Sequence, residues 1–168
     1  MSTRKASKKP IFPDLKDENI AVCIVVSQWH KDITNKLLNG ALGAFEKIKP
    51  GRSSVKVLHV SGSYELPLGA KWAIDTYAPD TVICLGCIIR GETPHFHYIS
   101  NAVVNGIMQL NLANNIPVIF GVLTTDTLKQ ARQRSGGKHG NKGADAAIAA
   151  LEMIELRNKL KLTHASKS

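Results

Sequence analysis

The sequence lacks any long hydrophobic run. In its 168 residues, no apolar stretch approaches the roughly 18–20 residues that a membrane-spanning helix requires, and no signal-type apolar region follows the N-terminus. We therefore expect no membrane association and a cytoplasmic location. The first ten residues are basic and acid-free, so an address to an organelle stays open as a second interpretation.

Cysteine is scarce: the chain has only Cys23, Cys84 and Cys87. The spacing Cys84-Leu-Gly-Cys87 matches a C-x-x-C motif, but it lies inside an apolar run that is typical of a strand. Residues three apart in a strand point to opposite faces, which suits neither a redox pair nor a zinc knuckle, and no second ligand pair exists. The sequence therefore predicts reduced, buried thiols and no metal site.

Acidic residues are few, with 13 against 22 lysines and arginines, for a net charge of +9. Residues 1–10 and residues 157–168 contain no acid and contribute +4 each, which leaves +1 for the body of the chain. A nucleic-acid interface places cations on ordered surface, with aromatics between them for single strands, whereas here the positive charge lies mainly at the two chain ends. We expect solubility tails and no nucleic-acid partner.

The remaining composition is that of one soluble domain, with 43% hydrophobic and 21% charged residues in a chain long enough to bury a core without disulfides or metals. We predict a flexible basic N-terminal tail over residues 1–18, a single domain over residues 19–163 and a flexible C-terminus over residues 164–168.

Short β-branched runs alternate with longer segments of helical period. The runs are Ile20–Val26, Val55–Val60, Thr81–Ile89 and Pro117–Leu123, and the helical segments include Ile33–Ile48, Phe96–Leu112 and Ala144–Leu160. Alternation of this kind predicts right-handed crossovers and a parallel sheet buried on both faces. The expected fold is a three-layer, flavodoxin-like α/β sandwich, with a mostly four-stranded parallel sheet and helices on both faces.

Polar and aromatic residues follow each predicted strand. They are Ser27–His30 after the first, Ser61–Glu65 after the second, Arg90–His95 after the third, and Phe120 with Thr124–Asp126 in and after the fourth. Because ligands bind beyond the carboxyl ends of parallel strands, we expect these residues to form a site at one edge of the sheet.

The first two of these segments have both a binding and a structural interpretation. Trp29 either stacks on a planar heterocycle or packs as an ordinary core aromatic. Ser63, Tyr64 and Glu65 offer hydroxyls and a carboxylate that suit a polyol or the N–H edge of a ring. Ser63 is equally an N-cap, with Pro67 in the first helical turn, and both interpretations can hold together.

The third segment combines an anion site with a titratable group. Free N–H groups at a helix start near Pro94, with the Thr93 hydroxyl, favour an anion. Arg90 either contacts a phosphate or pairs with a nearby acid. His95 is the candidate acid–base group, although a histidine at a helix start is more often structural. His97 points elsewhere, so the two histidines are not an obvious metal pair.

The glycine- and cation-rich segment Arg134–Gly143 suggests phosphate binding. It follows a helical stretch rather than a strand, however, and it lacks the Gly-Lys-Ser/Thr ending of a Walker loop. A helix C-terminus followed by a flexible linker explains it equally well.

Taken together, these motifs resemble the 6,7-dimethyl-8-ribityllumazine synthase family. The similarity runs in order from about Ile20 to Leu156 and rests on Ser27–His30, Leu37–Ala41, Gly62–Pro67, Leu85–His95, Pro117–Thr125 and Gly140–Gly143. The resemblance implies a transferase that condenses 5-amino-6-(D-ribitylamino)uracil with 3,4-dihydroxy-2-butanone 4-phosphate. Phosphate and water are lost and 6,7-dimethyl-8-ribityllumazine forms, in the penultimate step of riboflavin biosynthesis. No metal and no organic cofactor are implied.

The resemblance also assigns roles to residues of this chain. For the uracil-derived substrate, it implies ring stacking by Trp29, ribityl binding by Ser63, Tyr64 and Glu65, and recognition of the pyrimidine edge by the backbone of Cys87, Ile88 and Ile89. For the phosphate substrate and the chemistry, it implies Glu92, Thr93 and Arg134 as phosphate ligands and His95 as the proton-transfer group, with Phe120 closing the ring pocket.

Members of this family are homo-oligomers with sites between neighbouring subunits, and the neighbour contributes Phe120 and Arg134. The resemblance thus implies a pentamer or a 60-mer of pentamers, with riboflavin synthase as a candidate partner. The chain departs from the family pattern at Ser61, where proline is usual, at His97, where an acid is usual, and at His30, where asparagine is usual.

Three rival interpretations remain at this point. One is a flavin- or lumazine-binding protein without turnover, and another is a shell whose basic tail engages acidic cargo. The presence of both His95 and Arg134 speaks against these two, because storage requires no proton-transfer group. The third is a flavodoxin-type electron carrier, which predicts bound FMN and an acidic protein.

Overall fold

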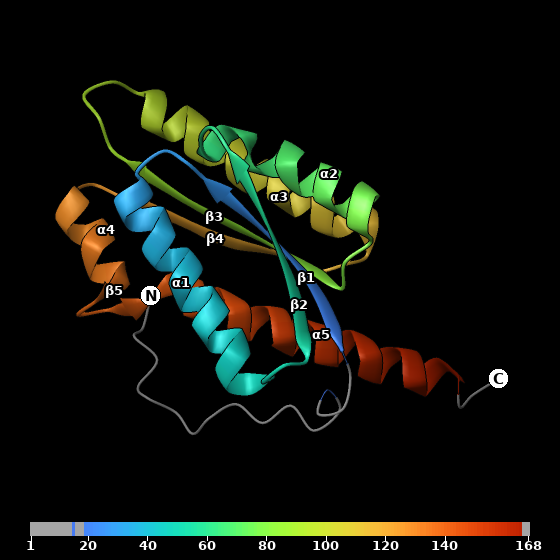
Figure 1. The fold of residues 1–168 in the computed structure, drawn as a ribbon. Helices are drawn as coiled ribbons and strands as arrows, with labels where there is room; N and C mark the ends of the chain where they lie inside the picture. Colours follow the sequence, from blue (N-terminus) through green and yellow to red (C-terminus); the bar gives the residue numbers. More distant parts are fainter. Residues whose placement is uncertain (1–14, 16–18, 166–168) are drawn as a thin grey trace.

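The central sheet consists of four parallel strands in the order β2-β1-β3-β4 (Figure 1). This computed structural model describes residue 15 and residues 19–165. The strands are β1 (Ile20–Ser27), β2 (Ser53–Val60), β3 (Thr81–Ile89) and β4 (Val118–Thr125). The predicted flavodoxin-like α/β architecture is confirmed, and the four predicted apolar runs lie in these strands except for Pro117, which directly precedes β4.

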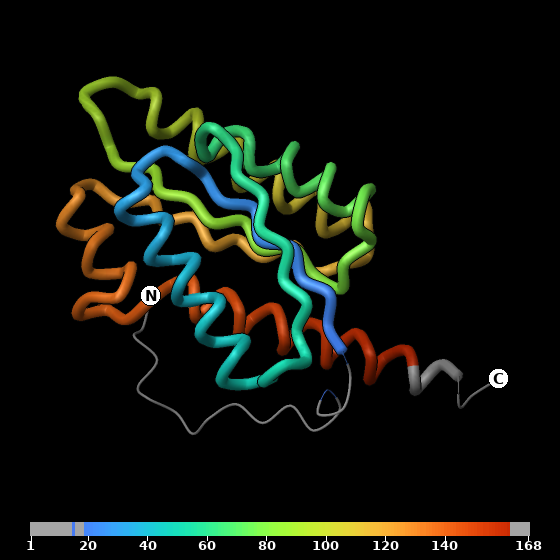
Figure 2. Tube along the Cα trace, viewed as in Figure 1, coloured from blue at the N-terminus to red at the C-terminus, as the bar shows by residue number. Residues whose placement is uncertain are grey.

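Helices cover both faces of the sheet (Figures 1 and 2). On one face lie α1 (Lys31–Ile48) and α5 (Lys142–Ala165), and on the other lie α2 (Leu66–Tyr77) and α3 (His95–Asn114). Strand β1 shows why its sequence is apolar throughout, because Val22 and Ile24 belong to the core under α1 and α5 while Cys23 and Val25 belong to the core under α2 and α3.

Leu15 is fully buried in the core under α1 and α5. It falls within the segment predicted as an N-terminal tail, of which residues 1–14 and 16–18 lie outside the described residues. At the other end, α5 continues to Ala165, and residues 166–168 lie outside the described part. No helix in that described part is both long and apolar enough to cross a membrane.

The two cysteines of the C-x-x-C spacing lie on opposite faces of β3, as predicted. Cys84 belongs to the core under α2 and α3 and Cys87 to the core under α1 and α5, and both thiols are free and buried. Burial raises the pKa of Cys84 to about 12. Burial and, secondarily, the negative charge of Asp32 raise the pKa of Cys87 to about 12. These thiols are therefore neutral and structural at physiological pH.

The segment after helix α4 (Leu128–Arg134) is ordered, not the flexible linker that was one interpretation of its sequence. It forms a short antiparallel pair, β5 (Ser135–Gly137) with β6 (Gly140–Asn141). The Asn141 side chain donates to the carbonyl of Lys36 in α1 at 2.7 Å and accepts from the N–H of Gly143 at 2.8 Å. A Cβ on Gly143 would lie 1.9 Å from the Leu37 carbonyl oxygen, so glycine is required where α5 meets α1.

Candidate active site

A pocket of about 370 Å³ lies beyond the carboxyl ends of the first three strands. Eight of the predicted site residues line it: Trp29, Ser63, Tyr64, Cys87, Ile88, Ile89, Thr93 and His95. The structure therefore brings together segments that follow three different strands, at the edge of the sheet where the parallel topology predicts a ligand.

The segment after β1 places Trp29 at the mouth of the pocket. Its side chain is 67% exposed, which argues against the core-packing interpretation and leaves a flat aromatic face available. The turn is held by the buried Ser27, whose hydroxyl accepts from the Trp29 N–H at 3.2 Å. His30 then takes a left-handed conformation (φ 58°, ψ 50°). Asparagine, which is usual at this position in the family that the sequence resembles, adopts this conformation more readily than most residues.

The segment after β2 places a hydroxyl inside the pocket. Ser63 is only 7% exposed, and among the described residues its Oγ finds no hydrogen-bond partner. Leaving such a group unsatisfied costs about 1–3 kcal/mol, so this hydroxyl is poised for a polar ligand. Gly86 on β3 makes room for it, because a Cβ there would lie 2.7 Å from that Oγ.

The capping role predicted for Ser63 is wrong. Residues Ser63–Glu65 form a short 3-10 helix, and the carboxylate of Glu65 accepts from the Gly62 N–H at 2.9 Å. Because this helix already begins at Ser63, the N-cap position belongs to Gly62, and the Ser63 hydroxyl has no partner among the described residues. Helix α2 then begins at Leu66 with Pro67 in its first turn, as predicted.

The end of β3 offers a backbone edge to the pocket. The pairing of β3 with β1 ends at Leu85, whereas its pairing with β4 continues to Ile89. Over Cys87–Ile89, β3 is therefore paired with β4 along one edge and is no longer paired with β1 along the other. These three residues line the pocket. Their peptide groups on the unpaired edge are available to the polar edge of a planar ligand.

The loop after β3 leads into α3, which begins at His95. Thr93 and the exposed His95 line the pocket, whereas Glu92 adjoins Thr93 without lining it. The first N–H groups of a helix have no intrahelical partner, and they favour a negatively charged ligand. The start of α3 and the imidazole of His95 therefore lie together at one end of the pocket.

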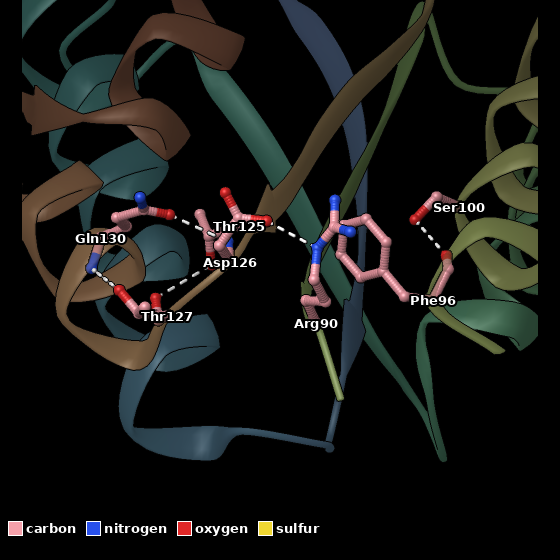
Figure 3. A network of polar contacts seen from close by, with 7 residues as sticks. All are labelled: Arg90, Phe96, Ser100, Thr125, Asp126, Thr127 and Gln130. Carbon is pink, nitrogen blue, oxygen red and sulfur yellow. Dashed lines mark hydrogen bonds and ion pairs between the residues drawn. The ribbon is translucent and has the colours of Figure 1, made fainter. Parts of the chain in front are cut away.

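Arg90 pairs with an acidic residue and does not line the pocket. Arg90 Nε donates to Asp126 Oδ1 at 2.6 Å, and the guanidinium lies 5.0 Å from the centroid of the Phe96 ring. Figure 3 shows this arrangement between the end of β3 and the end of β4. The choice left open by the sequence is decided in favour of an ion pair.

Phe120 and Arg134 do not line this pocket. Phe120 lies on the edge strand β4, beside Cys84 in the register and 40% exposed. Arg134 is the last residue of α4, and its Nη1 donates to the carbonyl of Gln130 at 3.2 Å. Glu65 borders the pocket through its contact with Gly62 but is not among the lining residues.

The pocket is also lined by His30, Gly62 and Gly91, which belong to the segments expected at the strand ends, and by Phe96 and Ile99, which the sequence did not single out for the site. Ile99 lies four residues after His95 and three after Phe96 on α3, so helical spacing would have identified Ile99 from His95 and Phe96 from Ile99.

Known proteins of one kind match this chain over most of its length. The family model described as 6,7-dimethyl-8-ribityllumazine synthase matches residues 19–158. A protein of that name from Parabacteroides distasonis is 49% identical over 144 residues, covering 84% of this chain and 88% of the relative. One from Cytophaga hutchinsonii is 51% identical over 131 residues, which is 78% of this chain and 82% of the relative.

A third relative of the same name, from Desulfotalea psychrophila, is 46% identical over 147 residues, which is 88% of this chain and 95% of the relative. The matched residues include all three strand ends that form the pocket. The chain belongs to the 6,7-dimethyl-8-ribityllumazine synthase family.

Proposed function

We propose that the pocket at the ends of β1, β2 and β3 is where this chain condenses 5-amino-6-(D-ribitylamino)uracil with 3,4-dihydroxy-2-butanone 4-phosphate to give 6,7-dimethyl-8-ribityllumazine. The observation that carries the assignment is one cavity that holds an exposed aromatic face, a free strand edge, an unsatisfied hydroxyl and a helix start with a histidine. These are the groups that a planar heterocycle with a polyol chain and a phosphate ester require together.

The first half of the pocket suits the uracil-derived substrate. Trp29 stacks on the ring, and the backbone of Cys87, Ile88 and Ile89 hydrogen-bonds its polar edge. Ser63 and Tyr64 lie beside that edge and bind the ribityl hydroxyls. Glu65, which already fixes Gly62, contributes its carboxylate from the rim.

The second half suits the phosphate substrate and the proton transfers. The backbone N–H groups of Glu92 and Thr93, with the Thr93 hydroxyl, bind the phosphate at the start of α3. The amine of one substrate attacks the ketone of the other, and an imine forms with loss of water. Elimination of phosphate follows, the ribityl-bearing nitrogen then closes the ring onto the remaining carbonyl with loss of a second water, and His95 moves the protons. Holding the two substrates together supplies much of the rate, since proximity alone contributes roughly 7–11 kcal/mol.

A neighbouring copy of the chain completes the site. Phe120 and Arg134 lie outside the pocket of their own chain, and in this proposal they close the ring pocket and clamp the phosphate of the adjacent subunit. Exposed large apolar side chains, among them Trp72, Tyr98 and Leu112, provide surface for association. The assembly is a pentamer or a 60-mer built from pentamers. Riboflavin synthase, which consumes the product, is a candidate partner.

The test is to mix purified protein with both substrates and to follow lumazine absorbance and phosphate release together, in the presence of a metal chelator. We expect stoichiometric formation of lumazine and phosphate, without an added cofactor. Tight binding of a lumazine or flavin with no turnover would instead establish a binding protein and refute the proposed reaction.

A further inference from the structure

Arg90 joins the loop after β3 to the end of β4. Its main-chain N–H donates to the Thr125 carbonyl at 2.9 Å, and its Nε donates to Asp126 Oδ1 at 2.6 Å. Main chain and side chain therefore hold the same junction, directly before the loop that carries Thr93 (Figure 3).

The other side of the Arg90 guanidinium contacts the start of α3. The guanidinium lies 5.0 Å from the centroid of the Phe96 ring, and Phe96 itself lines the pocket next to His95. The Phe96 carbonyl accepts from the Ser100 hydroxyl at 2.6 Å, which ties this turn to the next one. Arg90 thus fixes the aromatic residue that follows the proposed proton-transfer group.

Asp126 is held in turn by helix α4. The Asp126 N–H donates to the Gln130 side-chain oxygen at 2.8 Å, and the Thr127 hydroxyl accepts from the Gln130 N–H at 3.2 Å. The carboxylate is therefore presented to Arg90 by a capped helix start rather than by a free loop. The same helix ends at Arg134.

We propose that Arg90 and Asp126 are positioning residues for the condensation, whose ion pair sets the geometry of the 91–94 loop and of the first turn of α3. This inference rests on the proposed function of the pocket. The two side chains are 48% and 60% exposed, and pairs this exposed contribute little to global stability. Their effect is instead on geometry, since the N–H groups and the Thr93 hydroxyl bind a phosphate only while the loop holds them at hydrogen-bond distance and angle.

The decisive variants are Asp126→Ala and Arg90→Lys, with Asp126→Glu as the conservative variant. Asp75→Ala is the matched control, because it removes an ion pair with Lys71 whose side chains are similarly exposed, at 45% and 53%, and which lies on α2 outside the pocket. For each variant, the KM of each substrate, the inhibition constant of inorganic phosphate, the unfolding midpoint and amide hydrogen exchange are measured. The informative amides are Arg90 and His97, which donate to Thr125 and Pro94.

We expect Asp126→Ala to raise the KM of the butanone phosphate and the inhibition constant of phosphate about tenfold. The KM of the uracil substrate and the unfolding midpoint stay near wild type, and exchange at Arg90 and His97 becomes faster. Arg90→Lys keeps the charge but not the flat contact with Phe96, so it raises the two constants less. Asp126→Glu restores most of the affinity for the phosphate substrate, and Asp75→Ala changes none of these quantities.

Unchanged amide exchange in Asp126→Ala overturns the positioning role. Faster exchange overturns it as well if both KM values and the inhibition constant of phosphate stay at the wild-type level. An equal rise in both KM values together with a lower unfolding midpoint overturns it too, because that pattern marks general destabilisation. A wild-type protein without turnover would refute the proposed function, while exchange and phosphate binding would still decide whether the pair orders the loop.

Discussion

The two groups of expected site residues differ in how the single chain places them. Trp29, Ser63, Thr93 and His95 come from the ends of three adjacent strands and line one pocket. Phe120 and Arg134 belong to the edge strand β4 and to α4, and they lie outside that pocket. One chain therefore gathers the first group in a single pocket and leaves the second group outside it, and in the proposed function the second group serves the pocket of an adjacent copy.

The Arg134→Ala variant has the largest expected effect, because it removes the cation proposed to clamp the phosphate of the adjacent subunit. Loss of one partner in such a charge-assisted contact costs about 4 kcal/mol, which corresponds to a decrease in kcat/KM of about 1,000-fold. Steady-state kinetics with the butanone phosphate as the varied substrate measures it. The unfolding midpoint serves as the control and should stay at the wild-type value, since the contact of Arg134 with the Gln130 carbonyl lies within a single helical turn.

The His95→Ala variant should lower kcat by about 100-fold, near the lower end of the range for general acid–base catalysis. Activity persists because holding the substrates together does not depend on the imidazole. His97→Ala provides the matched control, since His97 is exposed and does not line the pocket. Equal losses in the two variants would remove His95 from its assigned role.

The Trp29→Ala variant should raise the KM of the uracil substrate about tenfold, since stacking of a base on an aromatic contributes about 1–3 kcal/mol. The KM of the phosphate substrate should change little, because Trp29 lies in the other half of the pocket. Trp29→Phe keeps a flat aromatic face at the same position and is the conservative control, with a KM near the wild-type value. A parallel rise in both KM values would contradict the division of the pocket into two halves.

The smallest effect concerns the thiols of β3. Because burial raises the pKa of Cys84 and Cys87 to about 12 from 9.0, the folded state holds protons that the unfolded state loses between these values. The stability that the two buried thiols contribute through their raised pKa values is thus fully present below pH 9 and is lost as the pH rises toward 12. Denaturant unfolding on either side of pH 9 should show a shallower pH slope in Cys84→Ala than in wild type. An identical slope would mean that the native thiol already ionises freely.

The layers of the fold could be predicted from the sequence because they depend on local patterns. Unbroken apolar runs identified strands covered on both faces, and helical spacing identified α1, α3 and α5. The location of the pocket followed from the same pattern, since the ends of parallel strands meet at one edge.

Contacts between distant residues were beyond such patterns. The ion pair of Arg90 with Asp126 depends on the register of β3 against β4. The Asn141 side chain donates a hydrogen bond to a carbonyl of α1 that lies 105 residues earlier. The capping interpretation of Ser63 is wrong because the 3-10 helix begins one residue earlier than a Ser63 cap requires, with Gly62 at the N-cap position.

Subunit complementation tests the central claim most directly. Differently tagged His95→Ala and Arg134→Ala chains are co-expressed, and the mixed oligomer is purified through both tags and assayed. If each site combines the pocket of one chain with Arg134 of its neighbour, random mixing leaves about one site in four intact and activity rises far above either parent. If both residues serve the same chain, every site in the mixture carries one defect, and activity no higher than the mean of the two parents would contradict the account.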